Sequence, residues 1–209
     1  MTTALKLFYA PRSRAFTALW ILEELGIEYE LESFDISSGR HKKEDYLALN
    51  PMGKIPVVTH GDVAIAETGA IAIYLSDLFT QNALAPALDD ATRPDYLRWI
   101  FFSASVMEPA YCEKFFDWWQ NPPASSVAWG SFDDMERALE EGLRGGPWLL
   151  GDTFSAADVV VGSTLRFGQM FGAMPRDGIF GEYTARLTAR EAFKRAEAIE
   201  ARESERFPR

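Results

Sequence analysis

The first 34 residues constrain the fold more than any other part of the sequence. Residues 4–9, "ALKLFY", have the apolar composition of a short buried strand, and residues 15–25 carry apolar side chains at helical spacing. Residues 27–34, "IEYELESF", alternate apolar and acidic side chains, which is typical of a strand with one solvated face. A strand, a helix and a strand in so short a length form a βαβ unit, so the two strands are predicted to be parallel.

The following residues complete a small sheet. A polar, helix-capable stretch, residues 39–49, leads into "NPMG", where Pro51 and Gly53 suit a β-turn. The strand-like runs "IPVVT" and "VAIA" are joined by the hairpin signal "HGD", and residues 67–79 have a helical pattern. The order βαβ and then ββα predicts an α/β domain of the thioredoxin type, with a mixed four-stranded sheet, over residues 1–82.

The second half of the chain has a different texture. Residues 80–90 have the composition of a linker, and no alternating strand pattern follows them. Breaks rich in Pro and Gly, among them one around residues 172–181, separate the helical segments. An all-α helical bundle is therefore predicted over residues 88–209. Its predicted helices span residues 92–119, 126–144, 155–172 and 188–203.

Charge and composition exclude several classes of function. The net charge is −10, and the basic residues are local, in "PRSR" at 11–14 and "RHKK" at 40–43. This pattern favours a small anionic ligand over nucleic acid or an anionic membrane surface. A single cysteine, Cys112, with only two histidines, predicts no disulfide within the chain and no metal site. Because the N-terminus lacks a signal-like apolar core and no apolar run is long enough to span a bilayer, a cytoplasmic protein is predicted.

Pro56 stands inside an apolar, β-branched run. Proline cannot donate to a sheet ladder, so within sheets it is confined to edges, bulges and first positions. One interpretation is a proline that opens a strand after a turn. The other is a cis-proline whose neighbouring backbone, that of Ile55, is free to pair with a ligand.

Two further positions admit both a structural and a functional interpretation. Glu67 and Thr68 stand between a strand and a helix, where they can cap the helix or bind the amine and carboxylate of an α-amino acid end group. Ser13 precedes the first helix, where it can cap the helix or donate to an anion beside Arg12 and Arg14. By contrast, "SAAD" at 155–158 has the pattern of a capping box and is predicted to be structural only.

Aromatic side chains are dense in the helical half. At helical spacing such residues are usually core, and the surplus here indicates that some of them line an apolar pocket near the domain junction. The candidates for the pocket are Trp99, Phe102 and Val106. The wider set contains Tyr96, Phe115, Phe116, Trp118 and Trp119 as well.

The segments "SRAFTALWILEELGIEYE", "HKKEDYLALNPMGKIPVV", "ETGAIAIYL" and "GDTFSAADVVVG", in this order and spacing, resemble the glutathione S-transferase superfamily. The resemblance extends over nearly the whole chain. The segment "SRAF…LW…LEEL" is similar to that of bacterial and fungal transferases that lack a catalytic cysteine. It implies a thioredoxin-like domain followed by an all-α domain. It further implies a cis-proline at Pro56, with the backbone of Ile55 pairing with the cysteinyl unit of glutathione.

The resemblance assigns roles to the remaining candidates. Glu67 and Thr68 match the pair that binds the γ-glutamyl end, and His41, with Lys42 and Lys54, matches positions facing the glycyl carboxylate in serine-type classes. Ser13 matches the hydroxyl that stabilises the thiolate. Tyr9 is a rival for that role because other classes use a tyrosine.

The implied function is a glutathione transferase that activates the glutathione thiolate for attack on a small hydrophobic electrophile. Glutathione is then a co-substrate, no cofactor is bound permanently, and a homodimer is implied. Two alternatives stay open. One is a non-catalytic glutathione-family binding protein. The other is a glutathione-dependent thiol reductase, although Ser13 and Arg14 stand where a cysteine is usual.

Overall fold

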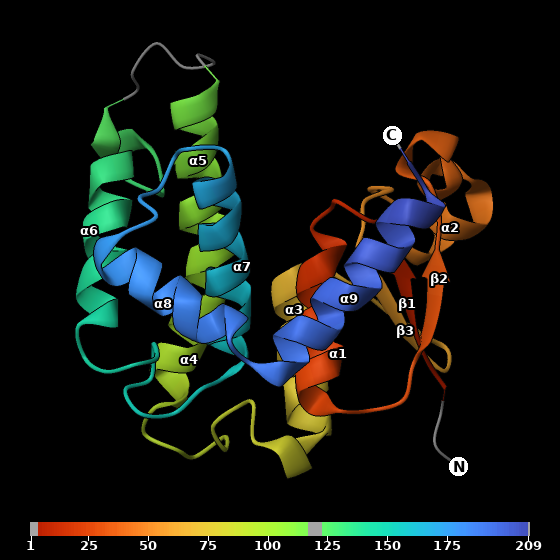
Figure 1. Ribbon diagram of the computed structural model, residues 1–209, viewed down its shortest axis with the longest axis horizontal. Coiled ribbons are helices and arrows are strands. Elements are labelled where there is room, and N and C mark those ends of the chain that lie inside the picture. Colours follow the sequence, from red (N-terminus) through yellow and green to blue (C-terminus); the bar gives the residue numbers. More distant parts are fainter. Residues whose placement is uncertain (1–3, 117–122, 209) are drawn as a thin grey trace. The chain divides into compact units, whose positions relative to one another are not determined.

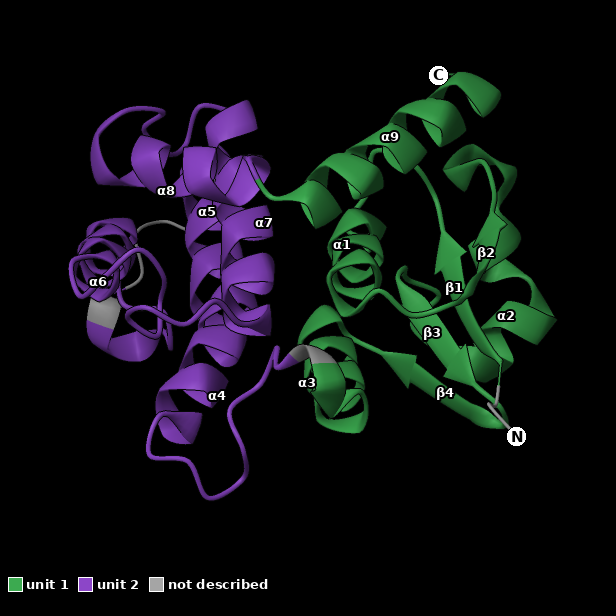
Figure 2. Cartoon of the chain, turned by 60° about the horizontal axis from the view of Figure 1, so that its bottom comes forward, with its two compact units in different colours: residues 1–82, 190–209 green, residues 83–189 purple. Residues whose placement is uncertain are grey.

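The structure is a computed structural model that describes residues 4–116 and 123–208. The chain divides into two compact units. The first contains residues 1–82 and 190–209, and the second contains residues 83–189 (Figure 2). None of the helices in the described ranges is long and apolar enough to cross a membrane.

The first unit is built on a four-stranded mixed sheet in the order β2-β1-β3-β4. Strand β1 (Leu5–Tyr9) pairs in parallel with β2 (Glu30–Ser33) and antiparallel with β3 (Val57–His60), which in turn pairs antiparallel with β4 (Val63–Ala66). Helix α1 (Ala15–Leu25) connects the parallel pair, and α3 (Thr68–Leu78) follows β4. The predicted thioredoxin-like βαβ-ββα domain is confirmed, although β2 is shorter than the expected 27–34.

The two faces of this sheet are covered by different helices (Figures 1 and 2). Helix α2 (Glu44–Leu49) covers one face, where Phe8, Phe34 and Tyr46 form a buried cluster. Helices α1 and α3 contact each other on the other face. Because side chains alternate across a strand, Leu7 and Tyr9 of β1 point to one face of the sheet and Phe8 points to the other.

The second unit is helical, as predicted. Its helices are α4 (Arg93–Phe102), α5 (Glu108–Phe115), α6 (Phe132–Leu143), α7 (Ala156–Met170) and α8 (Gly178–Thr188). The segment predicted as one helix over 92–119 contains a π-helical turn, Ser103–Met107, just before α5. Pro109 explains this turn, because proline has no N–H to donate to the carbonyl four residues earlier. The predicted capping box of α7 is present, with Ser155 and Asp158 as its members.

Two further sequence-based expectations differ from the structure. Helix α8 was not predicted, because Gly178 and Gly181 made residues 172–181 resemble a loop. A Cβ at Gly181 would lie 2.3 Å from the carbonyl oxygen of Arg176, so close packing requires this glycine. The second difference is the last helix, α9 (Glu191–Arg206), which was expected in the helical domain of residues 88–209. It packs on α1 and belongs to the first unit.

Candidate active site

The sheet register brings the candidate residues of the first unit to one end of the sheet. Tyr9 ends β1 and pairs with Ser33, the last residue of β2. The pairs Phe8–Val57 and Val57–Ala66 place the start of β3 and the end of β4 at the same end. The candidate residues therefore lie together at this end of the sheet: Ser13 after β1, Ile55 and Pro56 before β3, and Glu67 and Thr68 after β4. In the sequence these residues belong to separate motifs.

The segment before β3 is held by its main chain. The carbonyl oxygen of Lys54 accepts from the Tyr46 hydroxyl at 2.8 Å and from the Asn50 side-chain amide at 2.9 Å. Ile55 packs against the cluster beneath α2, and the Ile55–Pro56 bond is cis, as predicted. The two donors, Tyr46 and Asn50, are buried. By holding the Lys54 carbonyl, they fix the backbone that leads into Ile55.

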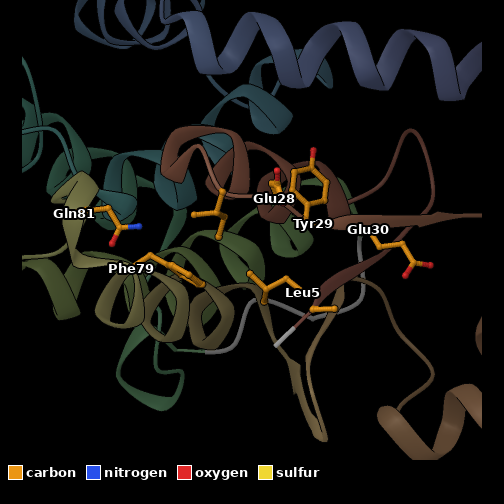
Figure 3. A pocket seen from close by; sticks show the side chains of 8 residues that line it. Leu5, Glu28, Tyr29, Glu30, Phe79 and Gln81 are labelled. Carbon is orange, nitrogen blue, oxygen red and sulfur yellow. The ribbon is translucent and has the colours of Figure 1, made fainter. Parts of the chain in front are cut away.

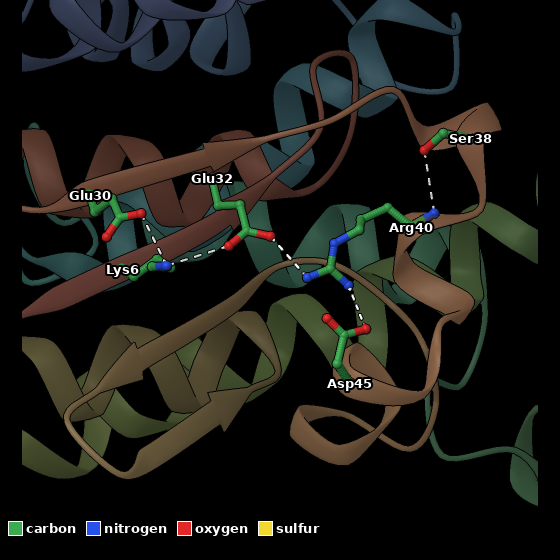
Figure 4. Close-up of polar contacts among 6 residues, drawn as sticks. All are labelled: Lys6, Glu30, Glu32, Ser38, Arg40 and Asp45. Carbon is green, nitrogen blue, oxygen red and sulfur yellow. Dashed lines mark hydrogen bonds and ion pairs between the residues drawn. The ribbon is translucent and has the colours of Figure 1, made fainter.

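A charge network fixes the neighbouring segment, residues 38–45, to the sheet (Figure 4). The guanidinium of Arg40 pairs with Glu32 of β2 at 3.0 Å and with Asp45 at 2.9 Å, and Glu32 also pairs with Lys6 of β1 at 3.5 Å. Partly exposed ion pairs contribute little to stability. Their effect here is to orient the short turn that carries the next residue, His41.

His41 lies beside the aromatic cluster of the first unit. Its ring stacks on Phe34, with ring centroids 6.4 Å apart. Burial, followed by the charges of Lys42 and Lys54, lowers the pKa of His41 below its usual value. His41 can therefore contribute a hydrogen bond to a ligand, while positive charge at this end of the sheet comes from Lys42 and Lys54, whose side chains are exposed.

Gly53 allows a close approach that only glycine permits. Its φ is +56°, and a Cβ there would lie 2.8 Å from both the His41 carbonyl oxygen and the Lys42 ammonium. We expect Gly53→Ala to lower the free energy of unfolding by about 2–5 kcal/mol, from left-handed backbone and overpacking together. Urea denaturation measures this change.

Gly39→Ala is the matched control for that prediction. Gly39 has a similar φ of +69°, but nothing lies within 4 Å of the position of its Cβ. Gly39→Ala therefore carries the backbone cost alone. Equal losses of stability in the two variants would show that the crowding at Gly53 has no energetic consequence.

Glu67 has an unusual backbone at the N-terminus of α3. It is the N-cap residue with φ 68° and ψ 121°, and its side chain makes no cap hydrogen bond. Such a conformation costs on the order of 1–3 kcal/mol in a residue other than glycine and is found mainly where function requires it. The Glu67 carboxylate makes no capping hydrogen bond to α3, and its side chain is exposed.

The two candidate hydroxyl groups have different partners. The Ser13 hydroxyl donates to the Ala10 carbonyl at 2.6 Å and accepts from the Ala15 N–H at 3.1 Å, so it satisfies the start of α1. Its side chain is half-buried. Tyr9 is 0% exposed, and its hydroxyl donates to the carboxylate of Glu200 in α9. No motif in the sequence marks Glu200.

The predicted apolar pocket needs one correction. Trp99 is 1% exposed, and its ring packs directly against Gly142. A Cβ added at Gly142 would lie only 2.1 Å from that ring, so Trp99 is a core residue of the second unit. Phe102 and Val106 are half-buried. Phe115 and Phe116 are more exposed, and Trp118 and Trp119 lie outside the described residues.

A pocket of about 570 Å³ opens at the opposite end of the sheet (Figure 3). It is lined by the starts of β1 and β2 and by residues after α3, including Leu5, Tyr29 and Phe79. The Tyr29 hydroxyl is bonded to Glu23 at 2.7 Å. Burial, followed by the bond to Glu23, raises the pKa of Tyr29 above its usual value. None of the candidate catalytic or glutathione-binding residues lines this pocket.

Comparison with known proteins identifies the family. Residues 3–77 match the glutathione S-transferase N-terminal domain, and residues 117–167 match the glutathione S-transferase C-terminal domain. Glutathione S-transferase 1 of Dianthus caryophyllus is 41% identical over 29% of this chain, which spans only 28% of that protein. A glutathione S-transferase-like protein of Aspergillus terreus, gedE, is 30% identical over 66% of this chain and 67% of its own.

A solved structure supports the same assignment. The glutathione S-transferase of a sphingomonad, in complex with glutathione, is 25% identical, has a TM-score of 0.76, and is covered over 98% of its chain by 94% of this one. The fold is that of a thioredoxin-like domain followed by a helical domain. The chain belongs to the glutathione S-transferase superfamily.

Proposed function

We propose that this protein is a glutathione transferase that binds glutathione at the end of the sheet that contains the C-terminal end of β1. The observation that carries the proposal is the convergence of Ser13, Ile55 and the Glu67–Thr68 pair at that end. Bound glutathione in the sphingomonad relative supports it.

Each end of the tripeptide has a matching group. Glu67 and Thr68 receive the γ-glutamyl amine and carboxylate, where α3 begins with no side-chain cap from Glu67. The main chain of Ile55, held in place through the Lys54 carbonyl, pairs with the cysteinyl unit. Lys42 and Lys54 attract the glycyl carboxylate and His41 donates to it.

The thiol is activated by the hydroxyl of Ser13 at the start of α1. An unperturbed thiol has a pKa of about 8.5, so little thiolate exists at neutral pH. A hydrogen bond to a charged group contributes about 1.5–3 kcal/mol, and a helix N-terminus about 0.3–1 kcal/mol. At about 1.36 kcal/mol per unit, these effects lower the thiol pKa by roughly one to three units.

The magnitudes favour Ser13 over Tyr9. To reach a thiolate, the Ser13 hydroxyl gives up a bond to a neutral carbonyl, whereas the Tyr9 hydroxyl gives up a bond to a carboxylate. Bonds to charged groups are about twice as strong as neutral ones. Ser13 therefore gains from the exchange, and Tyr9 does not.

In the reaction, the thiol proton passes to solvent and the sulfur forms a bond to an electrophilic carbon as the leaving group departs. We assign the electrophile to an apolar site that includes Phe102 and Val106 of the helical unit. Reduced glutathione is maintained in the cytosol, so we place the protein there. A reductase role is disfavoured because Cys112, the single cysteine of the chain, lies in α5 of the second unit.

The proposal is tested by calorimetry with glutathione, followed by turnover with a panel of hydrophobic electrophiles. Saturable binding and conjugation of at least one electrophile are expected. Binding without turnover on any electrophile would favour the non-catalytic alternative. Absence of binding would overturn the proposal.

We further expect a homodimer, from family membership and because closed two-fold pairs are the commonest assemblies. Sedimentation velocity at micromolar concentration should give about twice the chain mass of 23.5 kDa. A monomer at that concentration contradicts this expectation.

A further inference from the structure

Helix α9 lies alongside α1 within the first unit (Figures 1 and 2). At the start of α9, the Arg190 guanidinium forms a two-pronged ion pair with Glu24 of α1, with nitrogen–oxygen distances of 2.7 and 2.8 Å. Further along, Phe193 packs edge-on against Trp20 of α1, with centroids 5.0 Å apart. These contacts attach α9 to α1 independently of its C-terminal half.

The C-terminal half of α9 reaches the segment between β1 and α1. One oxygen of the Glu200 carboxylate accepts from the Tyr9 hydroxyl, and the other accepts from the backbone N–H of Arg12 at 2.6 Å. The Arg12 guanidinium donates in return to the carbonyls of Ser204, at 3.3 Å, and Phe207. Glu200 is thus bonded to both sides of Ala10 and Pro11, one residue from Ser13.

The backbone of Arg12 is left-handed, with φ 58°. A residue other than glycine keeps such a conformation only where its surroundings hold it. The bond from the Arg12 N–H to Glu200 and the bonds from its guanidinium to the end of α9 supply that support. The position of Ser13, the next residue, therefore depends on α9.

We propose that Glu200 is a positioning residue of the thiol site. Its carboxylate keeps the Tyr9 hydroxyl hydrogen-bonded to α9, so that Ser13 is the hydroxyl that stabilises the thiolate. The role rests on the proposed function. A thiolate offers the Tyr9 hydroxyl no stronger acceptor than the carboxylate that it already has. Replacing Glu200 with glutamine makes that acceptor neutral, so Tyr9 then gains by turning to the thiolate.

The first arm of the test examines the contact without glutathione. In nuclear magnetic resonance spectra, Glu200→Gln should shift the Arg12 backbone amide proton upfield, because its acceptor loses its charge. Glu205→Gln, which removes a charge from an exposed position of the same helix, is the matched control and should leave that resonance in place. An Arg12 resonance unmoved by Glu200→Gln would overturn the proposal.

The second arm measures the pKa of the bound glutathione thiol in a two-by-two design. Tyr9→Phe should leave this pKa unchanged when Glu200 is present, and should raise it by about one unit in the Glu200→Gln background. A change that merely loosened the fold would not make the effect of Tyr9→Phe depend on residue 200. Tyr9→Phe having the same effect in both backgrounds would overturn the role of Glu200 alone.

The two failures are distinguishable. If the unmodified protein fails to bind glutathione while Arg12 still responds to Glu200→Gln, the contact stands. The proposed function and the role that rests on it are then overturned together.

Discussion

Ser13→Ala is expected to raise the pKa of the bound glutathione thiol by about one to two units, because the charge-assisted hydrogen bond to the thiolate is lost. Below both pKa values, the thiolate fraction and the rate of conjugation then fall by about 10- to 100-fold. Affinity for glutathione should change much less, because Ile55, Glu67 and Thr68 still hold the peptide. Thiolate absorbance in the binary complex, titrated against pH, gives the pKa directly.

Tyr9→Phe is the control for Ser13→Ala, because it removes the other hydroxyl at the end of β1. The structure predicts no change in the bound-thiol pKa, since the Tyr9 hydroxyl is already bonded to Glu200. The opposite pattern, a pKa raised by Tyr9→Phe and untouched by Ser13→Ala, would transfer the activating role to Tyr9.

Thr68→Val is expected to weaken glutathione binding by about 10- to 100-fold, as one hydrogen bond to the γ-glutamyl carboxylate is lost. Valine preserves the shape and branching of threonine, so α3 should be retained. Calorimetry gives the dissociation constant.

A truncated ligand separates this loss from general damage to the site. Cysteinylglycine has no γ-glutamyl group, so its inhibition constant should be the same for Thr68→Val and the unmodified protein. A dissociation constant for glutathione that moves less than about twofold would indicate that Thr68 serves the helix alone.

The architecture of the first unit could be predicted because its signals are local. Alternation in "IEYELESF", the hairpin signal "HGD" and helical spacing in 15–25 each depend on neighbouring residues. Ser13, Ile55 and Glu67 were proposed from separate motifs and from the resemblance, and it is the strand register of the structure that groups them. The cis bond at Pro56 was predicted from its place in an apolar run and from the resemblance, and it is confirmed.

Long-range packing was beyond the sequence patterns. Glu200 and Tyr9 are 191 residues apart, and nothing near Glu200 distinguishes it from the other acidic residues of α9. The same holds for Trp99, whose helical spacing fitted both a core and a pocket position until its contact with Gly142 placed it in the core. Helix α8 was missed because Gly181 normally indicates a break, although here close packing requires it.

We expect this chain to bind glutathione and to hold its thiol as the anion. The most direct test is the thiolate absorbance of glutathione bound to the unmodified protein, titrated against pH with free glutathione alongside. We expect a bound-thiol pKa lower than that of free glutathione by roughly one to three units, which raises the thiolate fraction at pH 7 from a few per cent to about a quarter or more. A bound thiol that titrates together with the free one would contradict it.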